Sequence, residues 1–204
     1  MENVITEIKW QKRKRDRASV YIDGEFAFGA PAIVIAELRL KVGQTVDAES
    51  MSAIVAEAER DGAWNDALKY VSRSVRSVRE IRDYLARKEY EPSAITYAVD
   101  KLLDYGYADD AAYAKAYVSD HCARSGKKKL EFELKQKGVA RSIVTAVLSE
   151  VEELPHCLAL AQKYAKGKVL DYATKAKLAN YLYSKGFDWD VVHEVVDEME
   201  DSEQ

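Results

Sequence analysis

The sequence predicts a mainly α-helical protein: three tandem three-helix repeats, each resembling a helix-turn-helix unit, behind a small N-terminal α+β region that contains a β-hairpin. Three observations support this fold class. The 204 residues include only nine Gly and three Pro, which favours helix over a turn-rich β fold. Apolar residues recur at helical spacing from about residue 63 onward. The sign of the local charge alternates three times along the same stretch, which indicates a repeat. We place the N-terminal region at residues 1–62 and the repeats at residues 63–110, 111–153 and 154–204, the last including an acidic tail.

The N-terminal region is built around the dipeptide Asp23-Gly24. This dipeptide separates two short runs of alternating apolar residues in ASVYIDGEFAFGA, and Asp-Gly between such runs is a strong hairpin signal. The segment ITEIKW adds a third strand, with KRKRDR as the connection. The segments PAIVIAELRL and DAESMSAIVAEAERDG are predicted to be helices, the second capped by Asp47 or Ser50. The sequence therefore predicts a three-stranded sheet with one or two helices.

The repeat is visible in three segments that align without gaps, residues 81–102, 130–151 and 178–199, at offsets of 49 and 48 residues. Each segment continues into a helix with an apolar face at i, i+3, i+4 and i+7. Another helical pattern precedes each segment, in NDALKYVSRS, DDAAYAKAYVSDHCARS and LPHCLALAQKYAKG. Each repeat is thus predicted to hold three helices, and periods of this size are typical of stacked supersecondary units. The matched positions of the middle helix are Ile81, Leu130 and Leu178, then Leu85, Leu134 and Leu182.

The turn after the middle helix reads Lys-Gly-apolar in repeats 2 and 3. Gly138 and Gly186 are expected to have positive φ, since Gly adopts the left-handed conformation at little steric cost. Repeat 1 has Glu89 at this position, followed by Pro92 just inside the next helix. We therefore expect the turn of repeat 1 to be looser or capped differently.

Basic residues gather in the same part of every repeat. Residues 69–88 and 124–141 each hold seven Lys or Arg against two acids, and residues 163–185 hold six against one. Such segregation suits phosphates or an acidic protein groove, although a solvated charged face is the alternative for any one residue. Arg73, Arg76, Arg79 and Arg82 step by three around the predicted second helix of repeat 1. The candidate binding residues are Arg73, Arg76, Arg79, Arg82, Arg87, Lys88, Arg124, Lys127, Lys128, Lys129, Lys135 and Lys137.

The stretch GYADDAAYAKAYV, residues 106–118, has two interpretations. In the structural one, Gly106 ends an apolar helix, and one of Asp109 and Asp110 caps the next helix while the other faces the positive end of its dipole. Tyr113 then begins the packed face. In the functional one, the paired carboxylates perform acid/base work. The second interpretation lacks a nearby His, nucleophile or second acidic pair at ligand spacing, so we favour the first.

Other chemistry is not indicated. The segment SGKKK lacks the first Gly of a phosphate-binding loop and has Lys128 where Ser or Thr must bind magnesium. The dipeptides at 121–122 and 156–157 are both His-Cys, but adjacent helical residues point about 100° apart and rarely converge on one metal. We expect no catalytic residue, no cofactor and no metal site. The sequence has no run of 18 apolar residues and no apolar leader, so we expect no membrane span and no secretion. We interpret the two Cys as reduced thiols, which indicates that the protein is located in the cytoplasm.

Several of these motifs resemble the sequence motifs of a known protein family. The pattern G-x-A-D-D-x-x-Y-A-x-x-Y-V, from Gly106 to Val118, and the later L-x-x-x-L-K-x-K-G-V resemble the RecX family of recombination regulators. The family's usual Leu before the Asp pair is Ala108 here. The segments ALKYVSRSVRSVREIRDYL and YLYSKGFDWDVVHEVV resemble its first and closing repeats. The resemblance covers about residues 63–200, and the N-terminal hairpin resembles an extension of longer members.

The resemblance implies a regulator, mainly an inhibitor, that binds RecA–DNA filaments and modulates ATPase, strand exchange and coprotease activity in recombination and the SOS response. Its implied partners are the RecA filament and the single-stranded DNA within it, with weak binding of free DNA as a further possibility, and the protein is expected to be a monomer without enzymatic activity. Both capping of filament ends and coating of the groove fit this sequence. Two alternatives stay open: a DNA-binding protein of helix-turn-helix-like repeats, and a helical interaction scaffold, which the sequence pI of about 5.6 favours.

Overall fold

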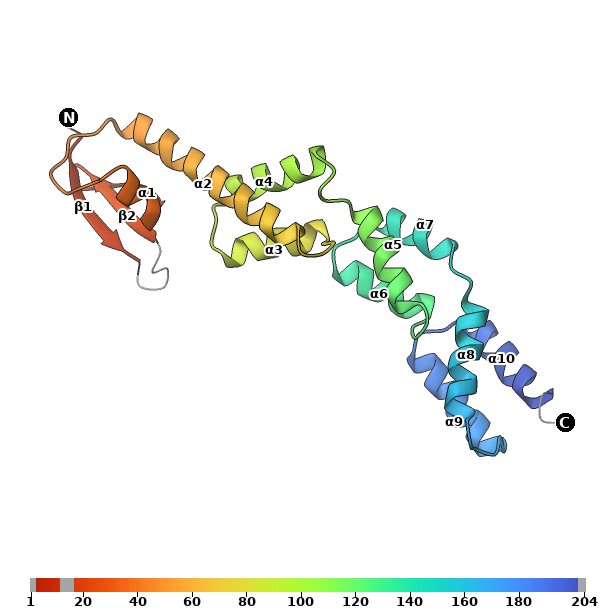
Figure 1. The fold of residues 1–204 in the computed structure, drawn as a ribbon. Coiled ribbons are helices and arrows are strands. Elements are labelled where there is room, and N and C mark those ends of the chain that lie inside the picture. The colour runs from red at the N-terminus through yellow and green to blue at the C-terminus, as the bar shows by residue number, and fades with distance from the viewer. Residues whose placement is uncertain (1–2, 12–16, 202–204) are drawn as a thin grey trace. The chain divides into compact units, whose positions relative to one another are not determined.

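The computed structural model describes residues 3–11 and 17–201 (Figure 1). Among these residues the chain forms a small sheet followed by helices, as the fold class requires. The strands are β1 (Ile5–Trp10), β2 (Arg17–Ile22) and β3 (Glu25–Pro31). The helices are α1 (Ala32–Glu37), α2 (Ala48–Val71), α3 (Val78–Arg87), α4 (Pro92–Asp104), α5 (Asp110–His121), α6 (Lys127–Gln136), α7 (Arg141–Ser149), α8 (Glu153–Ala165), α9 (Tyr172–Ser184) and α10 (Trp189–Asp201).

The chain divides into two compact units. One comprises Met1–Ser74 and Ile81–Tyr107, and the other comprises Val75–Glu80 and Ala108–Gln204. The first turn of α3 therefore packs within the second unit, while the rest of that helix belongs to the first.

The N-terminal sheet has the order β1-β2-β3, with antiparallel neighbours. The predicted hairpin is confirmed: Asp23 and Gly24 have φ of 50° and 86°, and positive φ at both central residues matches a type I′ turn. The third strand, β1, is also confirmed. Most of the predicted connection KRKRDR, residues 12–16, lies outside the described residues. Buried apolar side chains from the sheet, α1 and α2 form one core, with Ile5, Val20 and Val34 among its members.

Helix α2 differs from the prediction. Residues 47–62 and 65–74 were predicted to form separate helices, but α2 runs without interruption from Ala48 to Val71. Asp47 is its N-cap and accepts a hydrogen bond from the backbone N–H of Ser50. Gly62 lies inside this helix, and the Tyr90 ring lies 3.3 Å from where a Cβ on it would be. Gly62 therefore serves packing at this position and does not end the helix.

The helices form three groups of three: α2, α3 and α4, then α5, α6 and α7, then α8, α9 and α10. The aligned core positions behave alike in all three groups, which confirms the repeat. The side chains at both matched positions of the middle helix are fully buried, at 0% exposure. These residues are Ile81, Leu130 and Leu178, and Leu85, Leu134 and Leu182.

The turns after the three middle helices share one backbone conformation. Gly138 and Gly186 have positive φ as predicted, 82° and 86°, and Glu89 has a φ of 65°. In each turn the N–H of the residue after this position donates to the carbonyl five residues earlier, which is the Schellman pattern. The prediction of a differently built turn in repeat 1 is therefore wrong, although a non-Gly residue in this region carries a steric cost.

Candidate functional site

The predicted basic residues of repeat 1 do not all lie on one helix. Arg73 and Arg76 lie in the segment between α2 and α3, because α3 begins only at Val78. The prediction that four arginines step around a single helix is therefore wrong for these two. The others are on α3 or directly after it: Arg79, Arg82, Arg87 and Lys88.

The predicted basic residues of repeat 2 gather at the two ends of α6. Arg124 precedes the helix, and three lysines form its first turn. The remaining two lie in the last turn and at the C-cap. In chain order after Arg124 these residues are Lys127, Lys128, Lys129, Lys135 and Lys137.

Many of these cations already have an acidic partner in the fold. The Lys88 Nζ lies 2.9 Å from a carboxylate oxygen of Asp66, and the Lys128 Nζ lies 2.8 Å from one of Asp188. Lys137 pairs with Glu80 at 2.8 Å. Such surface pairs contribute little to stability, but they neutralise charge that a phosphate would otherwise meet. Three further cations are paired: Arg82 with Asp100 at 3.9 Å, Lys129 with Glu133 at 4.0 Å, and Lys135 with Glu131.

Three exposed arginines of the predicted set form no ion pair with any described residue: Arg73, Arg87 and Arg124. Arg87 donates a hydrogen bond to the backbone carbonyl of Asp83. Arg73 and Arg87 belong to the first unit and Arg124 to the second. Guanidinium groups present a planar array of donors that suits phosphate and carboxylate oxygens. We call these three residues the free arginines, and they are the strongest part of the predicted binding set.

The stretch from Gly106 to Val118 starts a helix, as the structural interpretation predicts. Gly106 has a φ of 67° at the end of α4. The Asp109 carboxylate caps α5 and accepts hydrogen bonds from the backbone N–H groups of Ala111 and Ala112 at 2.7 and 3.2 Å. Tyr113 is buried, with 6% exposure. Asp109 therefore satisfies N–H groups that would otherwise lack partners at the start of the helix.

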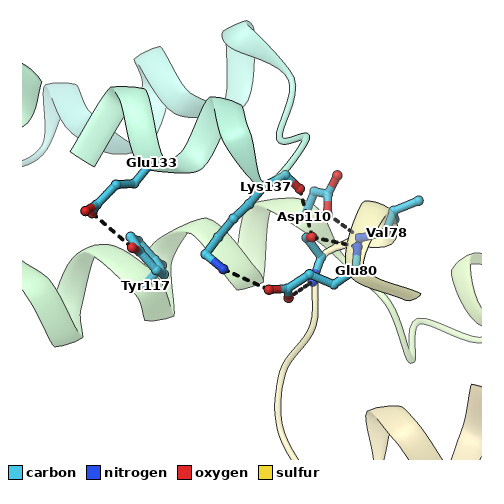
Figure 2. Close-up of polar contacts among 7 residues, drawn as sticks. Val78, Glu80, Asp110, Tyr117, Glu133 and Lys137 are labelled. Atoms are coloured by element: carbon cyan, nitrogen blue, oxygen red, sulfur yellow. Dashed lines mark hydrogen bonds and ion pairs between the residues drawn. The ribbon is translucent and has the colours of Figure 1, made fainter. Parts of the chain in front are cut away.

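Asp110 has a different partner, which the sequence reasoning missed. Its Oδ1 accepts a hydrogen bond of 2.9 Å from the backbone N–H of Val78, the first residue of α3 (Figure 2). A carboxylate at this place also faces the positive end of the α3 dipole. The two aspartates thus serve the starts of two different helices.

The start of α3 carries a reciprocal pair of side-chain caps. The Ser77 N–H donates to Glu80 at 3.2 Å, and the Glu80 N–H donates to the Ser77 hydroxyl at 3.2 Å. This is a capping box, whose signature S-x-x-E stands in the sequence and was overlooked. The Ser77 hydroxyl also donates to the Lys137 carbonyl at 2.8 Å, and the Lys137 ammonium donates to Glu80 (Figure 2). One Ser and one Glu therefore tie the start of α3 to the end of α6.

The electrostatics of this cluster follow from these contacts. Burial works to raise the pKa of Glu80, but hydrogen bonds from Lys137 and the Ser77 N–H outweigh it, so the pKa lies below its ordinary value. The hydrogen bond to Glu80 raises the pKa of Lys137. Burial, followed by the hydrogen bond to Glu133, raises the pKa of Tyr117 to about 12, and the Tyr117 hydroxyl donates to Glu133 at 2.9 Å. All these groups keep their ordinary charge at neutral pH, so the cluster stabilises contacts and is not tuned for proton transfer.

The start of α6 occupies the position in repeat 2 that the start of α3 occupies in repeat 1, but different chemical groups make its contacts. Gly126 stands where repeat 1 has Ser77, and its N–H donates to the Lys185 carbonyl at 2.9 Å. The Glu153 carboxylate accepts a 2.5 Å hydrogen bond from the Lys127 N–H. Glu153 is 7% exposed, and burial raises the pKa of its carboxyl above the ordinary value.

Each repeat thus has a carboxylate at the same place of its first helix. Asp110 lies four residues before the buried Ala114, and Glu153 lies four residues before the buried Cys157. In α2 the corresponding acid is Glu59, which is 3% exposed and pairs with Arg17 of the N-terminal sheet. All three acids bond to the preceding part of the chain. The spacing of apolar residues could not predict these three contacts. It shows which face of a helix is buried, but it does not show which group a carboxylate on that face will contact.

Within residues 3–11 and 17–201 no group of three or more His, Cys, Asp or Glu side chains is arranged to hold a metal ion. Cys122 and Cys157 are free thiols. None of the described helices is both long and apolar enough to cross a membrane.

Comparison with known proteins decides the family. Models of RecX domains match along the chain: the RecX N-terminal domain at residues 3–47, and the first, second and third RecX three-helix domains at residues 63–102, 109–148 and 150–196. The Regulatory protein RecX of Clostridium botulinum strain Alaska E43 is 32% identical over 201 residues, which cover 95% of each chain. This chain belongs to the RecX family. The RecX of Bacillus subtilis strain 168 is also 32% identical, over 96% of this chain and 77% of that relative.

Solved structures agree with this assignment. A crystal structure of a regulatory protein RecX superposes with a TM-score of 0.67 at 26% identity, over 95% of this chain and 98% of the other. The crystal structure of RecX from Lactobacillus salivarius, at 24% identity, has a TM-score of 0.65 over 71% of this chain and supports the fold. The family name implies a regulatory role.

Proposed function

We propose that this protein regulates RecA: it binds RecA–DNA filaments and, mainly as an inhibitor, modulates their ATPase, strand exchange and coprotease activity in homologous recombination, DNA repair and the SOS response. The observation that carries the proposal is the match to RecX models in the N-terminal region and in all three repeats. The protein acts without catalysis of its own, as a monomer in the cytoplasm, and its two free thiols are consistent with that compartment.

The free arginines support a contact with a polyanion or an acidic protein groove. A filament presents phosphates and acidic side chains over several subunits, and three linked repeats can engage several of them at once. Linked contacts raise the combined affinity above that of one repeat. The paired lysines of α6 contribute less, because a partner must first displace Glu80, Glu131 or Asp188 from them.

The test is the single-stranded-DNA-dependent ATPase of RecA with and without the full chain. We expect ATP hydrolysis to fall as the chain is added, and the effect to weaken at higher salt, because exposed charges are screened within a Debye length of about 10 Å at 0.1 M. Unchanged hydrolysis, together with no co-sedimentation of the chain with filaments, would refute the proposal.

A DNA-binding protein of helix-turn-helix-like repeats is the second candidate, and the free arginines favour it over an inert scaffold. It predicts binding of duplex DNA in the absence of RecA, with an affinity that falls steeply with salt because counterions are released. The same preparation can be titrated with a labelled duplex to separate the two functions.

A further inference from the structure

The first unit carries an aromatic cleft that the RecX resemblance does not account for. A hollow of about 710 Å³ lies where α2 and α4 end. We call it the Trp64 cleft. Its lining residues are Trp64, Leu68, Lys69, Val71, Ser72, Lys101, Tyr105 and Tyr107.

Three aromatic rings follow one another in this cleft. The ring centroids of Trp64 and Tyr105 are 5.8 Å apart, and those of Tyr105 and Tyr107 are 5.9 Å apart with an interplanar angle of 29°. Tyr105 and Tyr107 are 60% and 58% exposed. Large aromatic rings left this open cost hydrophobic free energy, so a row of them at one hollow indicates a surface that a partner covers.

The charge of the cleft is positive. Lys69 and Lys101 line it, and no carboxylate is among its lining residues. The Lys101 Nζ lies 4.5 Å from the centroid of the Trp64 ring, a cation–π contact that holds the ammonium at the aromatic surface. Arg73, one of the free arginines, follows α2 a few residues later. A second hollow of the same unit differs in this respect, because Glu37, Asp61 and Glu89 are among its lining residues.

Flat rings beside ammonium groups match one class of ligand, a strand that carries both unpaired bases and phosphates. Bases stack on aromatic side chains irrespective of sequence, while Lys and Arg track the phosphates. Duplex DNA hides the faces of its bases, and an apolar helix would find only Leu68 and Val71 as aliphatic contacts here. We propose that the Trp64 cleft binds single-stranded nucleic acid by stacking an unpaired base on Tyr105 and Tyr107, with Lys69 and Lys101 at the adjacent phosphates.

This site rests on the proposed function for its biological setting, since a RecA filament holds single-stranded DNA. Its test uses no RecA, so the two proposals can fail separately. The chain with Trp10→Phe and Trp189→Phe retains Trp64 as its single tryptophan. Its emission is titrated with oligo(dT), with an abasic oligonucleotide of the same length, and with a peptide that contains Phe and Glu.

We expect oligo(dT) to quench Trp64, and the abasic strand, which has the same phosphates but no bases, to quench it far less. The variant Tyr105→Ala/Tyr107→Ala should bind labelled oligo(dT) at least about fivefold more weakly, because the loss of one base–aromatic stack weakens binding by about fivefold or more. The matched control Phe132→Ala/Tyr172→Ala removes two rings that are 61% and 91% exposed elsewhere and should bind like the unmodified chain.

Equal quenching by the two oligonucleotides would overturn the proposal, because charge alone would then explain binding. Quenching by the peptide and not by oligo(dT) would overturn it in favour of a protein partner. Unchanged affinity of the Tyr105→Ala/Tyr107→Ala variant, with an unchanged melting temperature, would also overturn it. Loss of oligo(dT) binding in that variant while RecA inhibition persists would leave both proposals standing and separate the base contact from inhibition.

Discussion

The starts of α3 and α6 occupy the same position in successive repeats, yet they are built from different chemistry. At α3 the contact to the next repeat runs through side chains: the Ser77 hydroxyl donates to the Lys137 carbonyl, and Glu80 pairs with Lys137. At α6 the contact runs through backbone, since the Gly126 N–H donates to the Lys185 carbonyl. Both starts also receive a carboxylate, from Asp110 and Glu153.

The difference shows that the same repeat junction can be closed by a backbone contact or by a side-chain contact. A Cβ on Gly126 would lie 2.3 Å from the Phe187 nitrogen and 2.4 Å from the Gly186 carbonyl carbon, so the two backbones touch. At α3 the contact is made by the Ser77 hydroxyl, which also accepts the Glu80 N–H in the capping box. At the backbone contact, even the one carbon atom added by a Gly-to-Ala substitution would collide. At the side-chain contact, a substitution can remove a single hydrogen bond and leave the others in place.

The substitution Gly126→Ala should have the largest effect. The φ of Gly126 is −76°, so Ala is allowed by the backbone, and the cost comes only from the collision with residues 186 and 187. We expect a loss of roughly 3 kcal/mol in the free energy of unfolding, the upper range for overpacking. Urea denaturation measures it.

The matched control is Gly29→Ala, where the nearest atom would lie at an ordinary 3.6 Å. This control should change stability little. Equal effects of the two substitutions would mean that the backbones of α6 and its neighbouring turn do not touch.

Gly138→Ala should have the next largest effect, because it combines two costs. Its φ is 82°, and an added Cβ would lie 2.7 Å from the Cβ of Arg79. Gly167, with a φ of 75° and no atom within 4 Å of its added Cβ, isolates the backbone cost, which is about 1 kcal/mol. We expect Gly138→Ala to cost about 2 kcal/mol in thermal melts. A Gly138→Ala variant no less stable than Gly167→Ala would place Arg79 away from this turn.

Removal of Asp110 should act most directly on the start of α3. Asp110→Ala leaves the Val78 N–H without its acceptor, at a cost of about 1 kcal/mol. Asp110→Asn keeps an acceptor oxygen and should recover most of the loss. Chemical denaturation of both variants checks this, and hydrogen exchange at Val78 should accelerate only in the Ala variant. Equal stability of the two variants would show that the bond to Val78 contributes nothing.

The pH dependence of two carboxylates should have opposite sign. The folded pKa of Glu80 lies below the ordinary value of 4.5, so Glu80 stabilises the fold at neutral pH and loses this effect as pH falls through the folded pKa. The folded pKa of Glu153 lies above 4.5, so its favourable contribution exists at acid pH and is lost as pH rises through the folded pKa.

At pH 7, therefore, Glu80→Gln should destabilise the protein and Glu153→Gln should stabilise it, each by less than about 1 kcal/mol. Each difference should shrink as the pH falls through the folded pKa of the wild-type carboxyl, which lies above 4.5 for Glu153 and below 4.5 for Glu80. Melting temperatures across this range give the result. If both substitutions changed the melting temperature in the same direction, the two carboxylates would not differ electrostatically as proposed.

The sequence was most informative where local geometry decides structure. The type I′ hairpin at Asp23-Gly24, the positive φ of Gly138 and Gly186, and the cap at Asp109 each depend on a few adjacent residues. The repeat could also be predicted from the sequence, because apolar residues at matching positions of the three segments are expected to be buried in the same way. The capping box at Ser77 and the Asp171 cap of α9 are local signals that the sequence analysis did not use.

The errors came from contacts between distant residues. Asp61-Gly62 reads as a helix stop, but Tyr90 packs on Gly62 and α2 continues. The charge count indicated twelve available cations, but pairing with acids up to 60 residues away along the chain removes several of them, as Lys128 with Asp188 illustrates. Charge patterning shows where cations gather and not which of them already have a partner.

The central claim, that the free arginines deliver regulation of RecA, is tested most directly by charge reversal. The variant Arg73→Glu/Arg87→Glu/Arg124→Glu is compared with Lys9→Glu/Lys41→Glu/Lys115→Glu, which changes the net charge equally at exposed positions outside the predicted set. The measurement is inhibition of the single-stranded-DNA-dependent RecA ATPase, with melting temperatures recorded in parallel. We expect the arginine variant to lose most of its inhibition and the lysine variant to inhibit like the unmodified chain, both remaining folded because exposed charge changes cost little. Equal inhibition by the two folded variants would contradict the claim.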